Sequence, residues 1–345
     1  MATDANSAHL RDALLGHATA FRGLAERIAA LPDSQVAHAL LRQCLGPCKL
    51  QHLLRSLPTH LTASMATAIT LAQKVAFGTI VGRPLTIDAW MQATLPLSMG
   101  GCGIQAADTL APVARLGGVL QYLRHAEAIA RRAPGLIGPL PEVDGSLLTA
   151  LRARLPPDLA PLTMWERSGQ ITLCRGDAAK QHWWSDQVHN QQRLALRAKA
   201  TGRDIVRLEA QLKGQAGAWM SAPPAHGLGL AVDSEPYSLL LQWHLGLPLV
   251  AVEVAGRPCP TCGGAVDPFG DHSVSCGHAA FGKRHLGIQM FLCRALSNAR
   301  VPHDREVAVT GDLSRPADVL LKESGPRKPL VDQSAQAWPR DKGDP

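Results

Sequence analysis

Four residues near the C-terminus have the types and spacing of a metal site. Cys259, Cys262, His272 and Cys276 follow the spacing Cys-x2-Cys-x9-His-x3-Cys in CPTCGGAVDPFGDHSVSC. Zinc binds thiolate and imidazole groups well, and a structural zinc ion takes four such ligands in a tetrahedron. Each short spacer lets two side chains reach one ion from a single turn. We therefore predict one structural Zn²⁺ site without an open position for substrate.

The residues around these ligands fit the same interpretation. Gly263 and Gly264 follow the first pair, at a point where a tight turn needs a positive φ. Phe269 is the expected apolar plug of so small a unit, in which the ion replaces a core. His278 and Cys293 lie near enough in the sequence to be alternative ligands. The other interpretation is a set of free buried cysteines without a metal.

The composition predicts a mainly α protein with a small zinc-stapled α/β segment at the C-terminus. Hydrophobic residues make up 46% of the 345 residues, but aromatic residues only 4%. Abundant Ala and Leu with little Tyr favour helices over sheet. The 25 Pro and 31 Gly predict that many of these helices are short.

Periodic apolar residues and breakers predict the individual elements. Asp33 and Asp177 are suitable N-caps for the helices that follow them. A run of glycines at 100–103 predicts a tight turn between helices, because no strand precedes it and no Lys-Ser/Thr follows it. The expected helices are 9–31, 33–44, 51–56, 59–81, 106–132, 177–214, 238–247 and 281–299, and the expected strands are 306–310 and 319–321.

Stretches rich in Pro and Gly indicate the domain organisation. We expect a helical region, a linker, a helical connector, a domain with the zinc motif and α/β elements, and a disordered tail. Their ranges are 1–133, 134–161, 162–250, 251–332 and 333–345.

The charge of the chain suits an acidic partner. The net charge is +7 and the isoelectric point is near 9.1, which is typical of proteins that bind DNA or RNA. Basic residues of the 177–214 helix, among them Arg197 and Arg203, can contact phosphates; a solvated helical face is the alternative. The cysteines do not form a disulfide framework, and no secretory signal or membrane span is recognisable, so an intracellular location is expected.

The stretch from Cys259 to Asp318 resembles the C-terminal region of non-LTR retrotransposon polyproteins that carry a restriction-enzyme-like endonuclease. CPTCG, DPFGDHSVSC, Arg284-His285, Glu306 and RPADVLL carry the likeness. Upstream, four segments resemble the chain between the polymerase palm and that endonuclease, so the resemblance covers most of the sequence. They are 40–58, 90–104, 217–224 and 245–249.

The resemblance implies a fragment of a reverse transcriptase polyprotein. Residues 1–133 would be a thumb-like, post-palm region, and the location would be nuclear. Polymerases of this kind need paired aspartates for two metal ions, and the sequence has no Asp-Asp pair, so polymerase activity is not expected. Arg284, His285 and Arg315 would contact nucleic acid.

The resemblance also implies an endonuclease site, in which carboxylates hold Mg²⁺. Asp318 fits the first carboxylate, Asp332 the second and Glu306 a third. The expected Lys is missing, because Ser334 stands two residues after Asp332 and Lys342 is the only Lys beyond it. The catalytic site therefore resembles a degenerate one.

Three functions remain open from the sequence. The first is a nucleic-acid-binding remnant of a mobile element with a degenerate endonuclease site. The second is an active Mg²⁺-dependent DNA endonuclease. The third is a helical scaffold or protein-interaction module in which zinc only stabilises the C-terminal domain.

Overall fold

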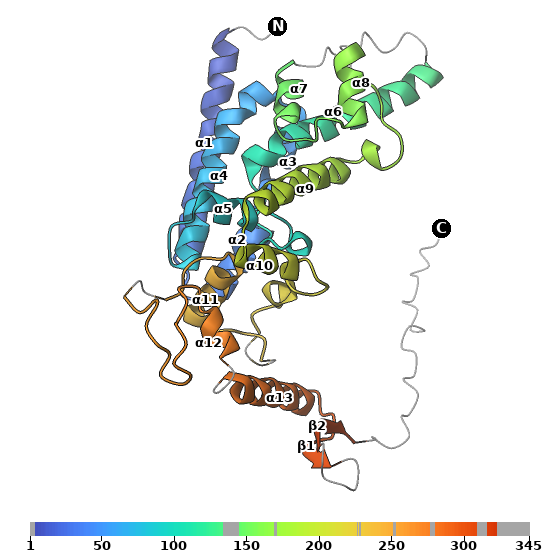
Figure 1. Cartoon of the computed structure of the whole chain (residues 1–345). Helices are drawn as coiled ribbons and strands as arrows, with labels where there is room; N and C mark the ends of the chain where they lie inside the picture. Colours follow the sequence, from blue (N-terminus) through green and yellow to red (C-terminus); the bar gives the residue numbers. More distant parts are fainter. Residues whose placement is uncertain are drawn as a thin grey trace, which may run out of the picture. The chain divides into compact units, whose positions relative to one another are not determined.

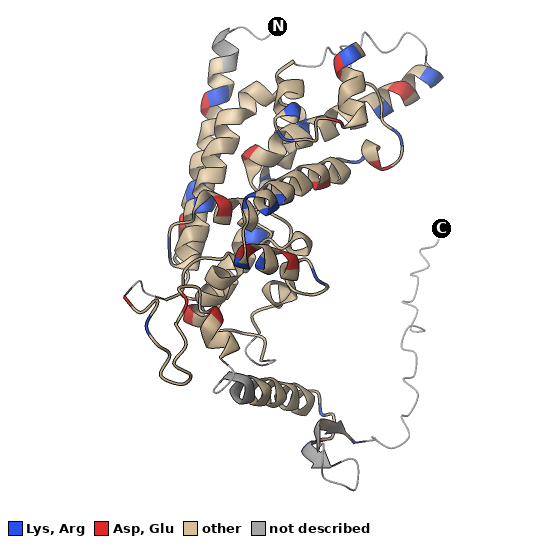
Figure 2. Cartoon of the chain, viewed as in Figure 1, with Lys and Arg blue, Asp and Glu red and all other residues tan. Residues whose placement is uncertain are grey.

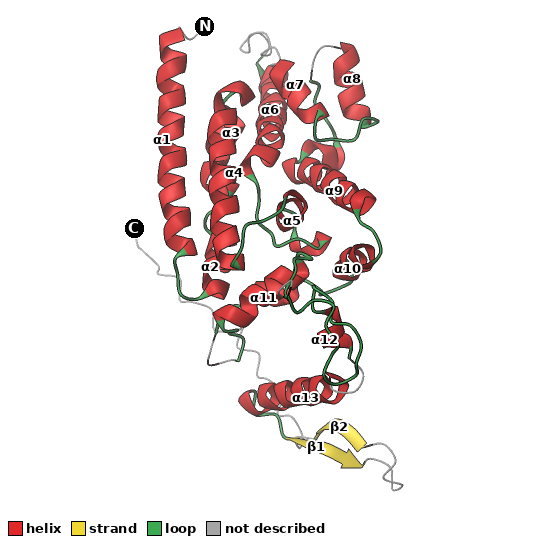
Figure 3. Ribbon diagram, turned by 60° about the vertical axis from the view of Figure 1, so that its left-hand side comes forward, coloured by secondary structure: helices red, strands yellow, loops and turns green. Residues whose placement is uncertain are grey.

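The computed structural model of the chain is mainly helical, as the composition predicts (Figures 1 and 3). It forms two compact units: the first comprises residues 1–225, 230–257 and 265–271, and the second 226–229, 258–264 and 272–345. The residues that the structure describes are 4–133, 145–168, 171–225, 227, 229–250, 253–276, 280–308 and 316–322.

The first unit is built from helices joined by short connections. Its α-helices are α1 (Asp4–Ala29), α2 (Ser34–Gln43), α3 (Gln51–Ser56), α4 (Thr59–Val81), α5 (Ile87–Ala93), α6 (Ala107–Arg132), α7 (Gly145–Arg152), α8 (Ala160–Ser168), α9 (Gln181–Lys199), α10 (Arg203–Gln211) and α11 (Ser234–His244). Short 3-10 helices are η1 (Pro47–Leu50), η2 (Leu97–Met99), η3 (Gly176–Ala179) and η4 (Ala218–Ser221). A short helix, α12 (Asp271–Ser275), begins at the last residue of this unit, and its remaining residues belong to the second unit.

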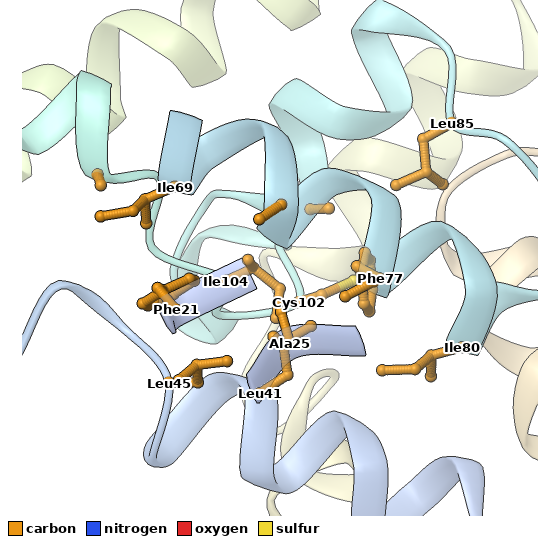
Figure 4. Packing of buried hydrophobic residues seen from close by; sticks show 14 of the residues in the cluster. Phe21, Ala25, Leu41, Leu45, Ile69, Phe77, Ile80, Leu85, Cys102 and Ile104 are labelled. Atoms are coloured by element: carbon orange, nitrogen blue, oxygen red, sulfur yellow. The ribbon is translucent and has the colours of Figure 1, made fainter. Parts of the chain in front are cut away.

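Two long helices form the main packing surface of this unit. α1 and α4 lie side by side, and α4 also contacts α6 (Figure 1). Small Ala side chains on α4 let neighbouring helices approach, and larger side chains fill the remaining space. Figure 4 shows this core, which is built from residues far apart in the sequence, among them Phe21, Leu41, Ile69, Phe77, Cys102 and Ile104.

Several predicted boundaries of these helices are confirmed. The helix predicted over 59–81 is α4, and Gly82 ends it in the left-handed conformation. Asp33 caps α2 as predicted, since its carboxylate accepts a 2.9 Å hydrogen bond from the Val36 N–H. α4 is long and apolar enough to cross a membrane, but most of its side chains are buried in this core.

A second core lies between α6, α7, α8 and α9. Trp165 stacks on Trp184 with ring centroids 5.3 Å apart, and Leu147 and Leu151 pack in the same cluster. Residues 145–161 therefore contain helix and buried side chains, whereas their Pro and Gly content predicts a linker. Residues 134–144 of that predicted linker, and the predicted tail from 333, lie outside the described residues.

The prediction of one continuous helix over 177–214 is wrong. The structure divides it into η3, α9 and α10, with Gly202 at a φ of +47° between the last two. Asp177 is not the N-cap, because Lys180 occupies that position and its ammonium pairs with Asp177 at 3.0 Å. The local signal for the break is Gly202, although an isolated glycine can also stand within a helix.

Buried polar side chains hold the glycine turn at 100–103. His38 Nε2 donates to the Cys102 carbonyl at 3.0 Å, and its Nδ1 accepts from the Tyr237 hydroxyl at 2.7 Å. His244 Nε2 donates to the Gly100 carbonyl at 3.0 Å. The predicted turn is thus confirmed, and side chains from α2 and α11 satisfy its main chain.

The second unit contains α13 (Ala280–Asn298) and an antiparallel hairpin of β1 (His303–Ala308) and β2 (Pro316–Leu321). All three elements were expected from the sequence. Arg305 pairs with Val319 and Val307 with Ala317, so the backbone register sets Glu306 opposite Asp318. Among the described residues these are the only strands (Figure 3).

Candidate metal centre

The loop that carries the first two cysteines is closed by its own backbone. The Gly263 N–H donates to the Cys259 carbonyl at 2.8 Å, and the Cys259 N–H donates to the Gly264 carbonyl at 2.7 Å. Gly263 has a φ of +73°, which an L side chain rarely adopts. The turn that the Gly-Gly pair predicts is therefore present.

The predicted ligands form one cluster. The ligand atoms of Cys259, Cys262, His272 and Cys276 all lie within 4.8 Å of one another, and Cys262 Sγ is 3.3 Å from His272 Nε2. A tetrahedron with Zn–S bonds of about 2.3 Å separates its sulfur atoms by about 3.8 Å. The side chains fit a zinc ion, and Nε2 is the imidazole atom that faces the cysteines.

The second pair of ligands comes from one helical turn. The Cys276 N–H donates to the His272 carbonyl at 2.8 Å, so α12 and its last hydrogen bond set the spacing between the two side chains. Cys276 is buried, whereas Cys259 is half-buried and Cys262 is exposed. The cluster therefore lies at the protein surface with one covered side.

Backbone N–H groups favour the thiolate form that a metal requires. Those of Thr261 and Cys262 lower the pKa of Cys259 to about 6. The Gly264 N–H stabilises the Cys262 thiolate, but burial and the neighbouring Cys276 and Cys259 raise the pKa of Cys262 above its ordinary value. A central cation would remove this repulsion between neighbouring sulfurs.

The donor set suits a closed structural site. Three thiolates and one imidazole would complete a zinc tetrahedron and would leave no position for a reacting water. Cys293 is not part of the cluster, and the other alternative ligand, His278, lies outside the described residues. The four ligands named from the sequence are therefore the four that the structure brings together.

Neither the family models, the curated proteins nor the solved structures compared with this chain give a match. The assignment of the centre consequently rests on its own geometry and chemistry.

The predicted endonuclease carboxylates are only partly within the described residues. Glu306 and Asp318 occupy opposed backbone positions in β1 and β2. Asp332 lies outside the described residues. The three-carboxylate site stays a prediction.

The predicted nucleic-acid contacts fall into two groups. Arg284 and His285 lie on α13, and Arg315 lies outside the described residues. Arg197 and Arg203 already have carboxylate partners in the first unit. Arg197 Nε donates to Glu209 at 2.7 Å, and Arg203 binds Asp271 through two nitrogens. Phosphate binding by these two arginines would compete with those ion pairs.

Sequence reasoning missed the contacts that Arg203 and Trp243 make with the segment directly before His272. Phe269, expected as an apolar plug, lies beneath the Arg203 guanidinium, with Cζ 4.2 Å from the ring centroid. Arg203 and the indole of Trp243 hold the pKa of Asp271 below its ordinary value. No local signal in the DPFGD run before the histidine indicates these partners, because Arg203 and Trp243 are distant in the sequence.

Proposed function

We propose that this chain is a fragment of a retrotransposon reverse transcriptase polyprotein without the polymerase palm. In this proposal it binds nucleic acid through a zinc-stabilised C-terminal region that carries a degenerate endonuclease site. The observation that supports it most is the Cys₃His cluster, whose ligand atoms lie within 4.8 Å of one another. The four residues have the spacing of the motif that carries the resemblance.

The charge distribution supports a sequence-independent mode of binding. The chain carries a net charge of +7, and Figure 2 shows Lys and Arg on several helices of the first unit. Phosphate contacts by dispersed basic side chains release counterions and depend on ionic strength. Nuclear localisation belongs to the same proposal, since the proposed partners are DNA and RNA.

Fluorescence anisotropy with labelled single-stranded RNA, single-stranded DNA and duplex DNA tests the proposal. The zinc-loaded protein should bind, and its affinity should fall by about 10³-fold or more between about 50 mM and 200 mM salt if six or more phosphates are contacted. A helical protein of equal net charge is the control. Affinity that matches the control, or that ignores salt, would instead support the scaffold function.

The β1–β2 register favours one further candidate, the Mg²⁺-dependent endonuclease. Glu306 and Asp318 are opposed in the hairpin, so two of the three carboxylates have neighbouring backbone positions. With Mg²⁺ bound there, the metal would stabilise charge on the scissile phosphate and activate water.

A plasmid nicking assay with and without Mg²⁺ separates the two candidates. Asp318→Ala should abolish metal-dependent nicking, whereas Asp304→Ala should not. Asp304 is a matched control, because it lies in the same hairpin and pairs with Lys322 at 2.8 Å. If the folded, zinc-loaded protein does not nick, the degenerate site is the better account.

A further inference from the structure

Three segments that are far apart in the sequence meet on one surface of the first unit. α6 contacts both α3 and α9 (Figure 1). Two adjacent glycines of α6 allow this approach. A Cβ at Gly118 would lie 2.3 Å from the Arg55 carbonyl oxygen, and a Cβ at Gly117 would lie 2.9 Å from Gln181 Cβ. Side chains of α3 and of the start of α9 are therefore brought together along α6.

The charged side chains of these segments are mostly basic. The segments are 49–56, 110–126 and 175–185. Their basic residues are Lys49, Arg55, Arg115, Arg124, Arg175 and Lys180. The one carboxylate in their sequence, that of Asp177, pairs with Lys180 at 3.0 Å. The next acidic residue along α6, Glu127, pairs with Arg131. The segments therefore supply much of the excess positive charge of the chain.

Neutral acceptors hold the two arginines where α3 meets α6. Arg55 Nη1 donates to Gln181 Oε1 and its Nη2 donates to Gln121 Oε1, both at 2.5 Å. Arg115 Nη1 donates to the main-chain carbonyls of Arg55 and Ser56, both at 2.9 Å. Both side chains are partly exposed. Amide and carbonyl oxygens fix the direction of a guanidinium but do not cancel its charge, so these groups still attract phosphate.

An exposed aromatic ring lies among these basic groups. Tyr122 of α6 is 46% exposed. It follows Arg115 by seven residues and Gly118 by four, so the three residues share one face of the helix. Single-stranded nucleic acid is bound by this combination, because its bases stack on an aromatic ring while its phosphates contact the cations. A duplex keeps its base faces stacked and offers such a surface only its phosphates.

We propose that the surface formed by α3, α6 and the start of α9 binds single-stranded nucleic acid. Tyr122 is its stacking ring, and Lys49 and Arg124 are among its phosphate contacts. The inference rests on the proposed function, to which it adds a binding surface in the first unit. Because amide oxygens already orient Arg55, its guanidinium loses little freedom on binding. Recognition through phosphates and stacking is tolerant of sequence.

Fluorescence anisotropy of the full zinc-loaded chain with labelled single-stranded RNA and DNA tests the charges of this surface. The double variant Lys49→Gln/Arg124→Gln removes two exposed cations. It should weaken binding by about tenfold at about 0.1 M salt and reduce the slope of log affinity against log salt by about 1.4. Arg11→Gln/Arg27→Gln is the matched control, because it removes the same charge from exposed positions of α1, which packs on α2 and α4. The control should bind within about twofold of the wild type.

Two further variants keep the test decisive if the double variant does not fold. Asp177→Asn removes the carboxylate that pairs with Lys180, so it should raise the affinity by about threefold. Tyr122→Leu should weaken single-strand binding by about fivefold or more. It should leave the salt dependence unchanged, because stacking releases no counterions, and it should change duplex binding by less than about twofold.

The outcomes separate this surface from the proposed function. Equal affinities of the Lys49→Gln/Arg124→Gln variant and the α1 control would overturn the surface and leave the proposed function in place. Equal binding of duplex and single strands, with no effect of Tyr122→Leu, would overturn the assignment to single strands. A wild-type chain that binds no nucleic acid would overturn both the surface and the proposed function.

Discussion

The helical first unit and the cysteine loop of the second are stabilised in different ways. In the first unit, apolar side chains from distant helices bury one another, and Phe77, Trp165 and Trp184 are fully covered. Among the residues after Leu247 whose side chains the structure describes, Cys276 is the one hydrophobic side chain that is buried. The comparison indicates that burial suffices for a large helical unit, whereas a short cysteine loop with so little buried apolar surface is the kind of segment that a bound metal can stabilise.

Removing the metal should give the largest effect and separate the two regions. Structural zinc contributes an apparent binding free energy of about 10–16 kcal/mol in small zinc domains. Cys262→Ser or a strong chelator should therefore remove amide hydrogen-exchange protection around 258–276, while α1 and α4 keep theirs. Cys44→Ser, at an exposed cysteine outside the cluster, should change neither. Equal loss of protection in both regions would contradict the comparison.

A core substitution should have the converse effect. Phe77→Ala removes a fully buried ring that lies 5.3 Å from the His38 ring, and it should lower the free energy of unfolding by about 3–5 kcal/mol. Urea unfolding followed by circular dichroism measures this change. Val75→Ala on the same helix, where the side chain is 59% exposed, should cost less than about 0.5 kcal/mol. Zinc stoichiometry should stay at one per chain in both variants.

The two buried histidines make the first unit sensitive to acid. Burial lowers the pKa of His38 and that of His244 to about 4. Since both are neutral when folded, their contribution is fully present above the unfolded pKa of 6.5 and is lost as the pH falls toward 4.

Urea unfolding at about pH 7 and about pH 5 measures this loss, which should be about 2 kcal/mol for each histidine. His244→Gln retains a donor for the Gly100 carbonyl but does not titrate. In this variant, the difference in unfolding free energy between the two pH values should therefore be smaller by about 2 kcal/mol. An unchanged difference would mean that other groups cause the acid sensitivity.

The smallest expected effect is a difference in zinc affinity between substitutions at two adjacent glycines of the loop. A Cβ at Gly264 would lie 3.1 Å from His272 Cε1 and 3.4 Å from Cys262 Sγ, so Gly264→Ala should displace ligands and weaken zinc binding by about tenfold. Gly263 has open space around it and only a positive φ, so Gly263→Asn should be tolerated. Competition with a chelator compares the zinc affinities of the two variants. Equal losses of affinity would show that the backbone conformation of the loop, and not contact with the ligands, sets the affinity.

Local patterns account for the elements that the sequence predicted. Apolar periodicity and breakers placed α1, α4, α6 and α13 within a few residues of their observed bounds. The division between α9 and α10 escaped prediction, because Gly202 is the one glycine at this point and an isolated glycine can also stand within a helix. The second core escaped it as well, because the Pro and Gly around α7 and α8 suggest a linker although Leu151 and Trp165 are fully buried.

The sequence by itself determined which four side chains form the candidate metal site, since each short spacer lets two of them meet within one turn of backbone. The tertiary structure decided the contacts between distant segments. Arg203 and Asp271 are 68 residues apart, and no local pattern encodes that pairing. The same holds for His38, whose partners Cys102 and Tyr237 come from distant segments. Such contacts form only after the helices have packed, because the packing brings their donors and acceptors together.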